Sequence, residues 1–81
     1  MLPRVIKVNA EPDYKIELLF NNGETKQFNV RPYLDYTVYK PLKEVAFFFK
    51  VRVCNGTVCW GDKMDVDFDP DTLYLESVPV S

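Results

Sequence analysis

The sequence contains no histidine, and its ten basic residues are nearly balanced by twelve acidic ones. The absence of histidine removes the side chain most often used for acid–base catalysis near neutral pH, which is also the commonest metal ligand. A formal net charge of −2 provides no positive field to attract nucleic acid or an anionic membrane. We therefore expect a protein that is not an enzyme, needs no cofactor and does not bind nucleic acid directly.

Long apolar segments are also missing, because the longest unbroken apolar run extends only from Val45 to Phe49. A membrane-spanning helix needs roughly 18 apolar residues, so no membrane span is expected. Near the N-terminus, Lys7 interrupts the apolar core that a signal peptide requires, and no small-residue cleavage site follows. These features predict a cytoplasmic protein without a membrane partner.

Cysteine is scarce, with only Cys54 and Cys59, which flank the dipeptide Asn55-Gly56. This dipeptide favours a two-residue hairpin turn, in which Cys54 pairs with Thr57 and the two sulfur atoms are expected on opposite sides of the ribbon. A four-residue loop over Asn55 to Val58 would instead place the cysteines opposite each other and allow a disulfide. The reducing cytoplasm favours the first interpretation, with two free thiols.

Aromatic residues, by contrast, are abundant at 15% of the 81 residues, and 47% of the chain is hydrophobic. This composition supports one hydrophobic core and differs from that of disordered chains. No repeats or linkers interrupt the sequence, so residues 1–81 are expected to form a single domain.

Alternating apolar residues predict a strand from Arg4 to Ala10, with Ile6 and Val8 on its inner face. A hairpin follows over residues 14–20 and 24–30. A two-residue turn at its tip would place Phe28 on the wrong face, whereas a three-residue loop with Gly23 in a left-handed conformation pairs Ile16 with Phe28. We therefore expect the three-residue loop.

Beyond Val30 the alternation stops, and Pro32 and Pro41 can each begin a helical segment. The second is expected to extend to about Phe49, with a core-facing stripe that includes Leu42, Val45 and Phe49. Residues 50–60 read as a second hairpin and residues 70–74 as a tight turn. The predicted fold class is α+β: a small antiparallel β-sheet of two hairpins with one short helix packed against it.

Five carboxylates near the C-terminus are spaced like the ligands of an EF-hand calcium loop. The sixth position of that loop needs glycine, but the residue here is Pro70, and no flanking helices are expected. The sequence therefore favours a solvated acidic edge with Val66 and Phe68 directed inward, and no metal is expected. A metal or small-ligand site would use the residues of this loop: Asp65, Asp67, Asp69, Asp71 and Glu76.

Aromatic residues interleaved with lysines are concentrated between Tyr33 and Phe49. A base-stacking platform for single-stranded nucleic acid is disfavoured by the acidic balance of the chain. Exposed aromatic side chains beside basic ones are typical of protein interfaces, although a small domain could instead bury all of these rings. The expected protein-binding residues are Tyr33, Tyr36, Tyr39, Phe47 and Phe48.

Several short motifs follow one another in an order that resembles the bacterial family called domain of unknown function 2442. These motifs are Pro3-Arg4-Val5, Phe20-x-x-Gly23-Glu24, Phe28-x-Val30-x-Pro32-Tyr33-Leu34, Gly56-Thr57-Val58-x-Trp60 and Pro70-Asp71-x-Leu73-Tyr74. The resemblance covers nearly the whole chain and implies a small α+β domain with an antiparallel sheet. It also implies a cytoplasmic protein without an assigned activity, and some members resemble the antitoxin of a toxin–antitoxin pair.

The sequence and the resemblance together predict a non-enzymatic protein-interaction module, antitoxin-like in the manner of those members. Its partner would be another protein or a second copy of the chain. The alternative is a small-ligand or metal-binding domain that uses the acidic loop over residues 65–76.

Overall fold

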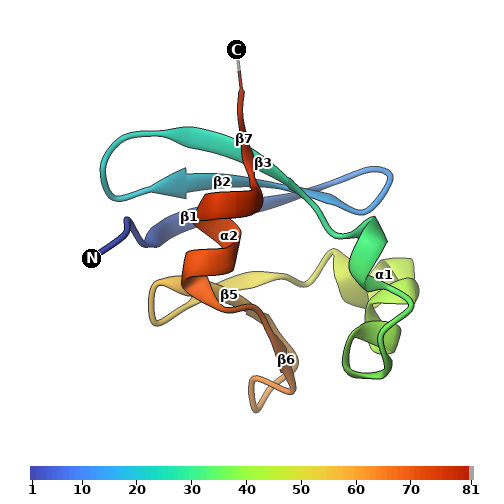
Figure 1. Ribbon diagram of the computed structural model, residues 1–81. Helices are drawn as coiled ribbons and strands as arrows, with labels where there is room; N and C mark the ends of the chain where they lie inside the picture. Colours follow the sequence, from blue (N-terminus) through green and yellow to red (C-terminus); the bar gives the residue numbers. More distant parts are fainter. Residues whose placement is uncertain (81) are drawn as a thin grey trace.

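The computed structural model describes residues 1–80 and places two antiparallel sheets one above the other (Figure 1). The upper sheet has the strand order β1-β2-β3-β7 and the lower sheet the order β4-β5-β6. The predicted α+β class is confirmed, but the sheets extend beyond two hairpins. The strands are β1 (Val5–Glu11), β2 (Lys15–Phe20), β3 (Thr25–Asn29), β4 (Arg52–Cys54), β5 (Thr57–Trp60), β6 (Val66–Asp67) and β7 (Val78–Pro79).

Short helices connect and cover the sheets. Helix α2 rises from the lower sheet to the upper one, whereas α1 lies beside them, on the side of the turn between β1 and β2 (Figure 1). No helix within the described residues is both long and apolar enough to cross a membrane. The helical segments are the 3₁₀ helices η1 (Arg31–Tyr33) and η2 (Thr37–Lys43) and the α-helices α1 (Val45–Phe48) and α2 (Pro70–Glu76).

The β2–β3 hairpin has the predicted register, with Ile16 paired to Phe28. Gly23 in the loop has a φ of +91°, the left-handed conformation that glycine adopts without steric cost. Ile16, Leu18, Phe20 and Phe28 are all buried on the inner face. The three-residue loop is therefore confirmed.

Strand β1 departs from the predicted pattern at Ile6. Val5 pairs with Phe20 and Lys7 with Leu19, so Ile6 is the extra residue of a β-bulge. The bulge leaves Val5 buried and Ile6 56% exposed, and the prediction that Ile6 faces inward is wrong. Val8, beyond the bulge, packs against the core as expected.

The β4–β5 hairpin has the predicted two-residue turn, with Cys54 paired to Thr57. A disulfide nevertheless joins Cys54 to Cys59, so the prediction of two free thiols is wrong. Residues two apart on a strand share a face, so Cys59 lies on the same face as Thr57 and hence as Cys54. As diagonal neighbours, the two cysteines have Cα atoms 5.9 Å apart, within the usual disulfide range.

The helix predicted from Pro41 to Phe49 is interrupted at Glu44, whose backbone is extended between η2 and α1. Because of this interruption, the side chains of α1 point in different directions from those that a continuous helix would give them. Leu42 is buried as predicted, but Val45 is 55% and Phe49 is 49% exposed. The prediction of one continuous core-facing stripe is therefore wrong.

Residues 70–74 form the start of helix α2 rather than the predicted tight turn. The carboxylate of Asp69 accepts a hydrogen bond from the backbone N–H of Thr72, and Pro70 occupies the first turn. An aspartate cap followed by proline is a favourable helix start. The aspartate side chain accepts a hydrogen bond from a backbone N–H of the first turn that has no partner within the helix, and proline has no backbone N–H that would need one. Leu73 is fully buried under this helix.

A polar anchor fixes α2 to the upper sheet. The ammonium of Lys26 donates to the backbone O of Tyr74 at 2.6 Å and lies 4.0 Å from the centre of its ring. The hydroxyl of Tyr74 in turn donates to Glu24 at 2.5 Å. This hydrogen bond, together with one from Asn22, lowers the pKa of Glu24 below its ordinary value. Strand β3 and α2 are thereby held in one arrangement.

Candidate functional site

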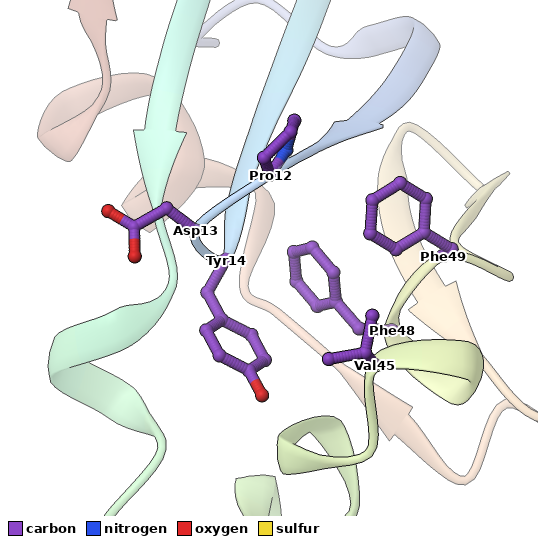
Figure 2. Close-up of a pocket in the computed structure, with 6 residues that line it drawn as sticks. All are labelled: Pro12, Asp13, Tyr14, Val45, Phe48 and Phe49. Atoms are coloured by element: carbon purple, nitrogen blue, oxygen red, sulfur yellow. The ribbon is translucent and has the colours of Figure 1, made fainter.

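An apolar pocket of about 260 Å³ lies between the β1–β2 turn and helix α1. Figure 2 shows the side chains of Pro12, Tyr14, Val45, Phe48 and Phe49 gathered around this space. The carboxylate of Asp13, the one charged group of the lining, points away from them (Figure 2) and pairs with Arg31. The interior of the pocket is therefore apolar.

The floor of the pocket is held by contacts between segments distant in sequence. Asp13 and Tyr14 both have positive φ angles, so the turn changes direction sharply and directs the Tyr14 ring toward α1. There the Tyr14 hydroxyl donates to the backbone O of Lys43 at 2.5 Å, and its ring meets Phe48 edge-on at 5.3 Å. Because these side chains are fixed by the fold, the pocket is preformed.

The rim of the pocket consists of Val45 and Phe49. Residues four apart in a helical turn lie on the same side, so the two side chains form one exposed apolar surface. Apolar surface beside a pocket is typical of a binding site for another molecule.

The residues predicted to bind a partner do not form one surface. Phe48 is 1% exposed because it packs against Trp60, so the prediction that it lies on the surface is wrong. Tyr36 is 61% exposed, as expected. Tyr33, Tyr39 and Phe47 are partly buried against the core.

The tyrosines form a separate cluster over Phe68. The Tyr39 ring stacks on Phe68 with centroids 4.5 Å apart, and Tyr33 meets the same ring edge-on at 5.2 Å. The Tyr33 hydroxyl donates to Glu76 at the end of α2. This cluster therefore joins η1 and η2 to α2.

The sequence predicts that Val45 and Phe49 face the core and does not indicate Pro12 or Tyr14 as binding residues, so most of the pocket lies outside the predicted site. One sequence signal indicates the rim: five consecutive apolar residues from Val45 to Phe49 exceed what one face of a single helical turn can bury. No sequence signal indicates that the β1–β2 turn lies opposite this run.

The pH dependence of the free energy of unfolding tests the role of Tyr33 in the tyrosine cluster. Burial, followed by the hydrogen bond to Glu76, raises the pKa of Tyr33 from 10.0 to about 12. Folding therefore favours the neutral phenol, and this contribution to stability is complete below pH 10 and lost as the pH rises toward 12. We expect the free energy of unfolding to fall across this window, and to fall less steeply in Tyr33→Phe.

Urea unfolding at a series of pH values, together with the absorbance of tyrosinate, measures this effect. Tyr36→Phe, at an exposed position of the same segment, controls for the number of tyrosines. A Tyr33→Phe variant with the same pH profile as the native chain would contradict the assignment.

The acidic segment forms the predicted solvated edge. Val66 and Phe68 are buried, whereas Asp65, Asp67 and Asp69 between and beside them are exposed. In the part of the chain that the structure describes, no three metal-ligating side chains gather in one place.

Helix α2 separates the remaining carboxylates of the EF-hand-like pattern. Asp69 caps the first turn of the helix, and Asp71 pairs with Arg4 at 2.8 Å. Glu76, at the other end of the helix, accepts the hydrogen bond from Tyr33. The chain is thus helical where a calcium loop would need to curl around its ion.

A family model described as "Protein of unknown function (DUF2442)" matches residues 5–79 of the chain. No curated protein and no solved structure matches the chain significantly. The matched range includes both sheets and every residue of the pocket.

Proposed function

This chain belongs to the DUF2442 family of proteins of unknown function, and we propose that it is a non-enzymatic protein-interaction module. The apolar pocket with its exposed rim of Val45 and Phe49 carries this proposal. The only charged side chain of the lining, Asp13, is directed away and paired. Such a lining offers contact to an apolar side chain but no nucleophile or base for chemistry.

The pocket suits an anchor residue of a partner protein. Interfaces concentrate their binding energy in a few bulky side chains that fill preformed pockets at low entropic cost. Here the Tyr14 hydrogen bond to Lys43 and the packing of Phe48 on Trp60 hold the floor before any partner arrives. One aliphatic or aromatic side chain of the partner would occupy the space between Pro12 and the rim.

The proposal includes the antitoxin-like role in the cytoplasm that the family resemblance implies. In that role the partner is the toxin, a protein encoded in the neighbouring gene, and binding holds it inactive. Co-expression of the two genes, followed by purification through a tag on one product, tests whether the complex forms.

Phe49→Asp is expected to weaken this complex about tenfold or more, because it buries a charge in an apolar contact. The position is half-exposed in the free chain, so the free energy of unfolding should change by no more than about 0.5 kcal/mol. Calorimetric titration with the co-purified partner measures affinity, and thermal unfolding measures stability.

Leu75→Asp is the matched control, since Leu75 is an exposed apolar residue on α2 and does not line the pocket. We expect it to bind the partner as the native chain does. A complex whose affinity is the same for Phe49→Asp and the native chain would place the interface elsewhere.

A further inference from the structure

The disulfide between Cys54 and Cys59 joins two strands that depend on it unequally. Every residue of β5 is buried, so the side chains of this strand hold it in the core. In β4, by contrast, Arg52 and Val53 are exposed and Cys54 is only partly buried. Strand β4 is therefore held mainly by its backbone pairing with β5 and by the disulfide.

The disulfide is a local constraint rather than a staple of the whole domain. Strand β1 lies alongside β4, but among residues 1–80 the backbone hydrogen bond between β1 and this hairpin joins Val5 N to Gly56 O in the turn. The cysteines are separated by only five positions, and a disulfide that closes so short a loop stabilises a fold least. Breaking the bond should consequently loosen β4 without unfolding the core.

Strand β4 also fixes one end of the segment that carries the rim of the pocket. At the other end, the indole N–H of Trp60 donates to the backbone O of Phe48 at 2.8 Å and holds the floor. Phe49 follows directly, and Lys50 and Val51 connect it to β4. The position of β4 thus determines where Val51 meets the core and how firmly the rim is held.

We propose that the Cys54–Cys59 disulfide is a reversible redox site, reduced by a dithiol, whose state determines how firmly the rim of the pocket is held. The link to binding rests on the proposed function, since the rim is part of the proposed interface. In the cytoplasm, the proposed location, disulfides are usually redox-sensing or catalytic rather than structural.

The exchange begins at Cys54, because it is partly exposed and Cys59 is fully buried. A thiolate of the dithiol attacks the Cys54 sulfur, the S–S bond breaks, and the Cys59 sulfur leaves with the electron pair and takes up a proton. The second thiolate of the dithiol then attacks its partner sulfur in the mixed disulfide and releases Cys54, which is protonated in turn. The chain gains two electrons and two protons, and the dithiol becomes a disulfide.

Titration with mixtures of reduced and oxidised dithiothreitol tests the redox role, with iodoacetamide to trap free thiols before mass spectrometry. We expect the folded chain to pass reversibly between a form with no alkylated cysteine and a form with both cysteines alkylated. A folded chain that keeps its disulfide in excess reduced dithiothreitol, and loses it only in urea, would overturn the proposal.

Amide hydrogen exchange of the oxidised and the reduced chain tests the effect on the rim. The backbone N–H groups of Phe49 and Lys50 donate to the carbonyls of Val45 and Phe47, each at 3.0 Å. We expect reduction to speed the exchange of these two amides about fivefold or more, because local opening of the segment becomes easier. The β2–β3 hairpin should exchange at the same rate in both states.

Cys54→Ser is the matched control, because it cannot form the disulfide and leaves the buried Cys59 unchanged. Its exchange at Phe49 and Lys50 should equal that of the reduced native chain, with or without dithiothreitol. Equal exchange of these amides in the oxidised and reduced native chain would overturn the proposal, as would a loss of protection throughout the domain. None of these measurements involves the partner protein, so their failure is distinguishable from a failure of binding at the pocket.

Discussion

Replacing Trp60 by alanine is expected to lower the free energy of unfolding by about 3 to 5 kcal/mol. The Trp60 side chain is fully buried, and its rings pack against Phe48 and Phe68 with centroids 6.0 Å away in each case. Its indole N–H donates to the backbone O of Phe48 at 2.8 Å. An 81-residue domain has a total stability of roughly 4 to 12 kcal/mol. The variant should therefore be largely unfolded at moderate temperature.

Trp60→Phe separates packing from hydrogen bonding at this position. It keeps an aromatic ring but leaves the carbonyl of Phe48 without its donor, which should cost about 1 to 3 kcal/mol. Urea unfolding monitored by circular dichroism suits all of these variants, because the two substitutions at Trp60 remove the fluorescent tryptophan. Tyr36→Ala, at an exposed ring, should change stability by less than about 0.5 kcal/mol. Native-like stability of Trp60→Ala would show that the core is centred elsewhere.

Lys26→Ala is expected to cost about 3 kcal/mol, an unusually large effect for a lysine. The side chain is only 8% exposed and ties β3 to α2 through the backbone O of Tyr74 and the ring above it. The substitution loses a charge-assisted hydrogen bond, a cation–π contact and the packing of the aliphatic stem. Thermal and urea unfolding measure the loss.

Two further variants separate the contributions to this loss of stability. Lys26→Met keeps most of the packing and should recover part of the stability, leaving the cost of the lost charge. Lys40→Ala, an exposed lysine in η2, should have little effect. If Lys26→Ala were as harmless as Lys40→Ala, the side chain would not anchor α2.

The β2–β3 hairpin was predictable because its register follows from local pattern. A slip by one residue would turn Phe28 and Val30 to solvent, so the apolar residues alone select the pairing that is observed. The 3₁₀ helix η1 was equally predictable from Pro32, whose ring fixes the backbone for a helical first turn.

Ile6 was assigned to the wrong face because the cause of the bulge is distant in sequence. Arg4 accepts a hydrogen bond from Asn21, and the next residue, Val5, donates to Gly56. These contacts fix the start of the strand from two sides, and one extra residue is accommodated before regular pairing begins at Lys7. Local alternation contains no information about such contacts.

The pocket could not be predicted for a related reason. Its two walls, the β1–β2 turn and α1, meet through the ring contact of Tyr14 with Phe48 and the hydrogen bond from Tyr14 to Lys43 at the end of η2, which no periodicity in the sequence reveals. The exposure of Val45 and Phe49 further depends on one extended residue, Glu44, inside a segment whose spacing otherwise predicts a continuous helix.

The anchoring of α2 also limits how early the domain can fold during its synthesis. The β2–β3 hairpin bonds through Lys26 to Tyr74, 48 residues further along the chain, and Arg4 pairs with Asp71 across 67 residues. During synthesis the apolar face around Phe20 stays uncovered until α2 and β7 have emerged from the ribosome. Contacts of this span make folding slow and leave that face accessible to chaperones on the nascent chain.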